Sequence, residues 1–152
     1  WLVPFLVHLV PWAGARPLGA YLLPAFWATF VALYFYGATA GLLTGLVVPA
    51  INLAVTGLPA WRSFGNTAVE MVVFVLAATW MVRRAPRFWL WAPAAYVAAK
   101  TVASLTVAYA VTVNRPDAAG YFFTHLLVGS GAGLAALALI NAALAKFYPK
   151  AD

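Results

Sequence analysis

Ionisable side chains are rare inside the apolar stretches of this sequence, and three of them are candidates for chemistry. Glu70 lies about two turns into one apolar stretch, Lys100 near the middle of the next, and His125 under two turns into the last. Asn66 precedes Glu70 by four residues and Ser104 follows Lys100 by four, so each would share a helix face with its charged neighbour. A carboxylate, an amine and an imidazole together suit an anionic or zwitterionic ligand.

The composition predicts an all-α integral membrane protein. Of the 152 residues, 66% are hydrophobic and 8% are charged, and the mean hydropathy is +0.93. A transmembrane helix takes about 20 residues, so the length predicts a six-transmembrane-helix bundle as a single domain over residues 1–152. The absence of cysteine excludes disulfides and thiolate metal sites. The net charge of +6 gathers at helix ends, which indicates membrane topology rather than nucleic-acid binding.

The apolar stretches place the helices along the chain. Residues 1–12 are too short to span, so we expect a first helix whose beginning precedes this numbering. The other five helices are predicted at residues 20–36, 37–59, 64–82, 88–113 and 120–147.

The distribution of Lys and Arg predicts the orientation. One side of the membrane receives five of these residues and the other side three, which places the C-terminus in the cytoplasm. The cytoplasmic set is Arg83, Arg84, Arg87, Lys146 and Lys150, and the outer set is Arg16, Arg62 and Arg115.

Charged groups at this depth cost a few kcal/mol if they face lipid, so they are expected to pair or to line a watery cavity. We therefore predict one polar cavity, open to the outside, between the last three helices, with Asn52 and the loop arginines near its mouth. The alternative is a structural ion pair between Glu70 and Lys100, with His125 bonded to a neighbouring carbonyl group.

A glycine stripe marks the segment at residues 37–59. Gly37, Gly41 and Gly45 recur at every fourth position and Pro49 continues the series, which predicts a face where a neighbouring backbone comes close. The same packing role is predicted for the glycines of the last helix, Gly129 and Gly133.

No enzyme signature is evident, and the chain is predicted not to be an enzyme and to need no cofactor. His125 and Ser130 are five residues apart, a spacing that does not place two side chains on one helix face. His8 and His125 could in principle bind a haem from both sides, but two histidines among six helices favour this reading little.

Three segments together resemble a known family. The run at 36–49, Tyr-Gly-Ala-Thr-Ala-Gly-Leu-Leu-Thr-Gly-Leu-Val-Val-Pro, is followed by Thr-Gly-Leu-Pro-Ala at 56–60 and Ala-Val-Glu at 68–70. In this order they resemble the glycine-rich helix, Thr-Gly-Met-Pro-type turn and Ala-Leu-Glu-type helix start of the substrate-binding S components of energy-coupling factor (ECF) transporters. The resemblance covers about residues 18–84.

The resemblance implies a six-helix protein that binds a vitamin or similar small solute from outside and passes it inward. Its partners would be a second, coupling membrane subunit and two ATPases. Carried over by position, it implies that residues 56–62, with Trp61 and Arg62, and Glu70 form the pocket wall. The small-x-x-x-small pattern by which the family docks its coupling subunit is absent from residues 1–12.

Two function classes therefore remain open. The first is a solute-binding transport subunit in the bacterial plasma membrane, and it predicts a cavity of at least about 300 Å³ around the charged groups. The second is a non-transporting accessory subunit of a larger membrane complex, and it predicts paired charges and a closed cavity.

Overall fold

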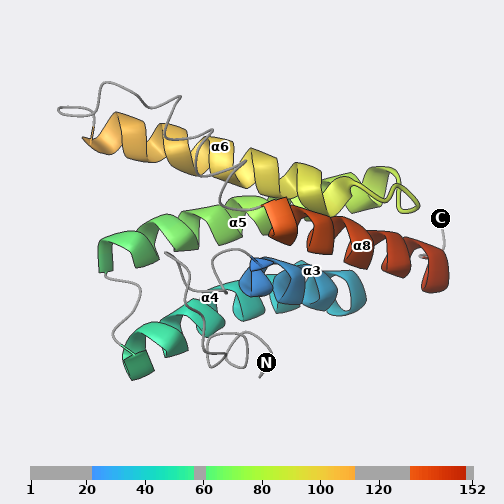
Figure 1. Ribbon diagram of the computed structural model, residues 1–152, viewed down its shortest axis with the longest axis horizontal. Coiled ribbons are helices and arrows are strands. Elements are labelled where there is room, and N and C mark those ends of the chain that lie inside the picture. Colours follow the sequence, from blue (N-terminus) through green and yellow to red (C-terminus); the bar gives the residue numbers. More distant parts are fainter. Residues whose placement is uncertain (1–21, 57–60, 112–130, 150–152) are drawn as a thin grey trace.

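The chain forms five helices in the part that the structure describes, and no strand occurs in these residues. The computed structural model describes residues 22–56, 61–111 and 131–149 (Figure 1). The helices are α3 (Pro24–Tyr36), α4 (Ala38–Thr56), α5 (Trp61–Arg84), α6 (Trp91–Val111) and α8 (Gly131–Phe147). The all-α prediction is therefore confirmed for these ranges. The predicted first helix, at residues 1–12, lies outside them.

Successive helices run in opposite directions, so one end of the bundle gathers the ends of α3, α5 and α8 and the starts of α4 and α6 (Figure 1). At this end the Tyr34 hydroxyl donates to the carbonyl oxygen of Tyr148 at 2.9 Å. We call this end of the bundle the basic end. It carries four of the five cationic residues that the sequence analysis assigned to the cytoplasmic side of the membrane: Arg83, Arg84, Arg87 and Lys146. The fifth, Lys150, lies outside the described residues.

Aromatic rings fix α5 and α6 against α3. The Phe26 ring meets the Phe74 ring edge to face at 5.2 Å between centroids and the Tyr96 ring at 4.8 Å. All three side chains are buried, and such ring pairs add about 1 kcal/mol each beyond the burial of their surface. Glu70 precedes Phe74 by one turn and Lys100 follows Tyr96 by one turn, so this core also sets the positions of the two charged groups.

Two glycines bring α4 close to its neighbours. A Cβ atom on Gly41 would lie 2.9 Å from the Leu33 Cβ atom of α3. A Cβ atom on Gly45 would lie 3.1 Å from the Thr29 hydroxyl oxygen and 3.3 Å from the Met71 Cβ atom of α5. A larger residue would not fit at Gly41 or Gly45 without moving a neighbour, so both glycines lie where helices come close together.

Pro49 and Gly133 are also buried, inside α4 and α8 respectively. Both positions agree with the predicted packing role. Gly129 lies outside the described residues.

Gly37 departs from the predicted stripe. It is exposed, and a Cβ atom there would meet nothing within 4 Å. Its φ of 90° and ψ of 179° belong to a backbone region that is essentially restricted to glycine. The prediction that Gly37 packs against a neighbouring helix is wrong: Gly37 ends α3, donates its N–H to the Leu33 carbonyl oxygen at 2.9 Å, and turns the chain into α4.

Two helix starts also differ from the prediction. α5 begins at Trp61, so Trp61 and Arg62 belong to its first turn. The prediction followed the apolar run, which begins at Phe64, although residues 61–63 contain no helix breaker. α6 begins at Trp91 and not at residue 88, with Pro93 in its first turn, where a missing N–H group does no harm.

Among the described residues, one helical segment, Phe64–Arg84 of α5, is long and apolar enough to cross a membrane, with a mean hydropathy of 1.5. Three more apolar helices are shorter than a span requires: Pro24–Tyr36, Ala38–Ile51 and Gly131–Phe147. The described residues are thus compatible with a membrane location, which they support through a single helix.

Candidate functional site

The side chains of Glu70 and Lys100 form an ion pair between α5 and α6. The Lys100 Nζ atom lies 2.8 Å from both carboxylate oxygens of Glu70. Only 5% of the Glu70 side chain is exposed, against 24% of the Lys100 side chain. The carboxylate is therefore enclosed, while the Lys100 side chain remains partly exposed.

Asn66 completes the cluster from one turn earlier on α5. Its Nδ2 atom donates to the Glu70 Oε1 atom at 2.8 Å. The four-residue spacing within a helix places these two side chains on one face, as the sequence predicted. We refer to Asn66, Glu70 and Lys100 as the polar cluster.

The polar cluster holds two charges inside an apolar bundle, so its stability depends on both partners. The Glu70 carboxylate accepts hydrogen bonds from two different side chains, and charge-assisted bonds of this kind are about twice as strong as neutral ones. The Lys100 Nζ atom also lies 5.8 Å from the centroid of the Tyr96 ring, within the range of a cation–π contact. Removal of the Lys100 amine would leave the Glu70 carboxylate buried without its counterion, at a cost of about 3–5 kcal/mol.

Ser104 and Thr101 lie on different sides of α6. Ser104 is half-buried one turn beyond Lys100, on the predicted face. Thr101 is exposed, and its hydroxyl donates to the Val97 carbonyl oxygen of its own helix at 2.8 Å. Ser104 thus lies on the face of α6 that carries Lys100, whereas Thr101 is on the exposed side.

Four predicted site residues lie beyond what the structure describes. These are His125 and the side chains of Asn52, Trp61 and Arg62. Their predicted contribution to a binding site stays a prediction.

A second polar contact, at the basic end, joins α8 to the start of α6 and was not predicted. The Asn141 Oδ1 atom accepts the Ala92 N–H at 2.8 Å, and its Nδ2 atom donates to the Phe88 carbonyl oxygen at 3.2 Å. Ala92 belongs to the first turn of α6, whose N–H groups have no acceptor within the helix. Asn141 is 1% exposed. It is the only residue with an amide side chain in the apolar run 131–147, and this sequence feature could have identified it as a candidate for a buried polar contact.

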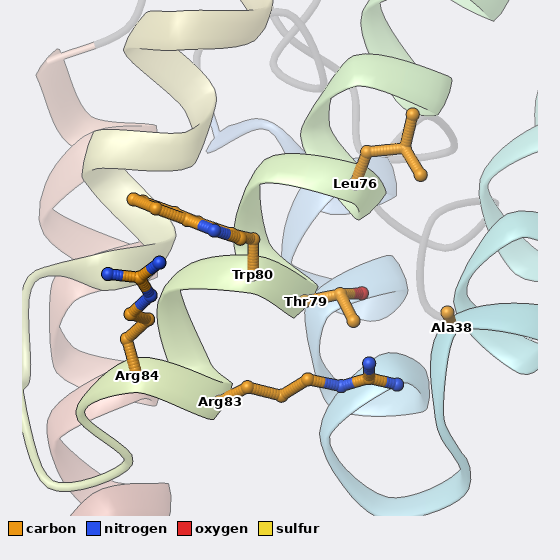
Figure 2. Close-up of a pocket in the computed structure, with 6 residues that line it drawn as sticks. All are labelled: Ala38, Leu76, Thr79, Trp80, Arg83 and Arg84. Carbon is orange, nitrogen blue, oxygen red and sulfur yellow. The ribbon is translucent and has the colours of Figure 1, made fainter.

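A pocket of about 500 Å³ lies at the basic end, away from the polar cluster (Figure 2). Figure 2 shows Thr79 and Arg83 on the side of α5 that faces Ala38, with Trp80 and Arg84 on the opposite side. The remaining lining residue is Leu76. Glu70 and Lys100 do not line this pocket, so the cavity predicted around them stays a prediction.

The described residues contain no group of three or more His, Asp or Glu side chains that could hold a metal ion. The polar cluster contains a carboxylate, which can bind a cation, an amine, which can bind an anion, and an amide, which can bind either.

Comparison with known proteins gives no relative for the chain. No family, no curated protein and no solved structure matches it.

Proposed function

We propose that the chain is the substrate-binding subunit of an ECF-type solute uptake system in a bacterial plasma membrane. It would be a multi-pass bundle of six helices that binds a small anionic or zwitterionic solute from the outer side. The observation that carries the proposal is the polar cluster: three polar side chains meet in an apolar bundle, and the lysine side chain among them is partly exposed.

A zwitterionic solute suits this cluster because it can replace the internal contacts group for group. Its carboxylate would accept hydrogen bonds from the Lys100 amine, and its ammonium group would donate to Glu70, which Asn66 continues to hold. Each buried charge then keeps an opposite partner throughout, which avoids the cost of an isolated charge. Neutral solutes of the same size offer no such exchange.

The resemblance of residues 18–84 to S components is the second support. Two of the residues that carry it, Gly41 and Gly45, pack α4 against α3 and α5, and Glu70 lies in the polar cluster. By this resemblance, uptake would require a coupling membrane subunit and two ATPases. The positive-inside rule would place the basic end in the cytoplasm and the far end of the bundle outside.

A second candidate function is a non-transporting accessory subunit of a larger membrane complex. The observation that favours it is the pairing itself, since Glu70 is enclosed and both of its oxygens are engaged at 2.8 Å. In that role the polar cluster would only join α5 to α6.

The experiment that tests the proposal is mass spectrometry of small molecules that copurify with the chain. The wild-type protein is compared with Lys100→Met and with a matched control, Lys146→Met, which removes an exposed cation at the end of α8. The proposal predicts a charged solute bound to the wild type and to Lys146→Met, and its loss from folded Lys100→Met.

Two results would contradict the transport proposal. One is a solute retained equally by all three proteins, which would place it away from Lys100. The other is a bound solute that is purely cationic or apolar, since neither kind needs the Lys100 amine.

A further inference from the structure

The basic end carries more positive charge than the chain itself neutralises. Its four cationic residues are Arg83, Arg84, Arg87 and Lys146. The chain has three acidic residues in all, of which Glu70 is bound to Lys100, and Asp117 and Asp152 lie outside the described part. Within the described residues, therefore, no carboxylate faces these cations, and an anion from outside the chain is their natural counterpart.

An exposed apolar face of α5 leads directly to the arginines. Val69, Val72, Leu76 and Trp80 are all exposed, with Leu76 at 59% and Trp80 at 56%. The spacing of three and four residues places Val69, Val72 and Leu76 on one side of the helix. Leu76 and Arg83 point to the same side of α5 in Figure 2, whereas the Trp80 ring points to the opposite side. The face thus has a long apolar part and a cationic end, which matches the shape of a lipid: an acyl chain with a phosphate at its head.

The pocket at the end of this face has further polar groups in its wall. The Thr79 hydroxyl oxygen is buried there, and it has no hydrogen-bond partner among the described residues. Ala38 starts α4 beside it, and the first N–H groups of a helix have no acceptor within the helix. In Figure 2 the Arg83 side chain extends from α5 toward the same region.

The Arg84 guanidinium is held on the other side of α5. Its central carbon lies 4.9 Å from the centroid of the Trp80 ring, a cation–π contact. Arg83 is thus the arginine that faces the Thr79 hydroxyl and the start of α4, and it is the one expected to bind the headgroup.

We propose that the pocket formed by Thr79, Arg83 and the start of α4 binds the phosphate of an anionic phospholipid, whose acyl chain lies along Val72 and Leu76. This site needs a membrane location only. It does not depend on the solute proposed for the polar cluster, so either proposal can fail without the other.

The test is equilibrium binding of phosphatidylglycerol to the full chain in neutral detergent, measured by native mass spectrometry. Phosphatidylcholine and inorganic phosphate are measured in parallel. Arg83→Gln is compared with Arg87→Gln, which removes an exposed cation of the same end that does not line the pocket. Both side chains are exposed, so neither change disturbs the core.

The site predicts that phosphatidylglycerol binds in preference to both other probes. Arg83→Gln should weaken this binding about tenfold, the loss of one charge-assisted contact. Arg87→Gln should change it by less than about twofold, as expected for a screened surface charge. Leu76→Gln should also weaken the binding of phosphatidylglycerol while the binding of inorganic phosphate stays the same.

Three results would overturn the proposal. Equal losses in Arg83→Gln and Arg87→Gln would mean a diffuse attraction to the whole basic end. Equal binding of phosphatidylcholine would mean that the negative charge of the lipid is not recognised. Inorganic phosphate that binds as well as the lipid, and is lost in Arg83→Gln, would mean a small-anion site.

Discussion

Asn141 of α8 accepts a hydrogen bond from the backbone N–H of Ala92, 2.8 Å away in the first turn of α6. The two residues are 49 positions apart in the chain. The Asn141 side chain therefore caps the start of α6 and joins that helix to α8. Its Nδ2 atom also donates to the carbonyl oxygen of Phe88, which precedes α6.

Replacement of Asn141 by Leu should destabilise the fold by about 2–3 kcal/mol. The substitution keeps the branched shape of the side chain but leaves the Ala92 N–H and the Phe88 carbonyl oxygen without this partner. The measurement is the free energy of unfolding in mixed detergent micelles. Leu139→Ala on the same helix, at a side chain that is 71% exposed, is the control and should change little. Equal effects of the two substitutions would show that the amide has no special role.

Replacement of Gly41 by Ala should destabilise the packing of α4 on α3. The new Cβ atom would lie 2.9 Å from the Leu33 Cβ atom, and overpacking of this kind costs about 1–3 kcal/mol. Gly65→Ala in α5 is the matched control, since a Cβ atom there meets nothing within 4 Å. That change should be neutral or stabilising by up to about 1 kcal/mol, the difference in helix propensity. A Gly41→Ala protein as stable as Gly65→Ala would argue against close contact of the two helices.

Replacement of Gly37 by Ala should also destabilise, for a different reason. There is room for the side chain, but the φ of 90° is strained for any residue with a Cβ atom, at a cost of about 1–3 kcal/mol. Gly131→Ala, also in open space but without positive φ, is the comparison. Thermal unfolding of the two variants separates them, and an unchanged midpoint for Gly37→Ala would mean that the turn between α3 and α4 has another conformation.

The polar cluster gives a double-mutant prediction. Lys100→Met alone should cost about 3–5 kcal/mol, because Glu70 then stays buried without its counterion. The double variant Glu70→Leu/Lys100→Met should recover most of this loss, since both charges are gone. The unfolding free energies of the wild type, the two single variants and the double variant complete the cycle. Strictly additive losses would contradict the ion pair.

The sequence predicted the helical class and part of the polar cluster for a simple physical reason. Spacings of four residues act within one helix, so they placed Asn66 beside Glu70 correctly, and the depth of Glu70 and Lys100 required a partner. The packing of Gly41 and Gly45 followed from the same local rule.

Other features depend on backbone geometry or on distant parts of the chain. The four-residue spacing of Gly37 could not show that the helix breaks there, because the break is a property of its φ and ψ angles. Asn141 caps a helix that begins 50 residues earlier, and the basic-end pocket exists because the end of α5 meets the start of α4. Neither relationship is present in any single window of the sequence.

Solute retention by the double variant Glu70→Leu/Lys100→Met tests the central claim most directly, because that protein should fold while its polar cluster is gone. The measurement is the amount of copurified solute per protein, by mass spectrometry, beside the wild type and Lys146→Met. If the polar cluster binds the solute, the double variant is stable and empty, while the other two proteins carry equal amounts. A stable double variant that still carries the wild-type amount of solute would contradict the claim.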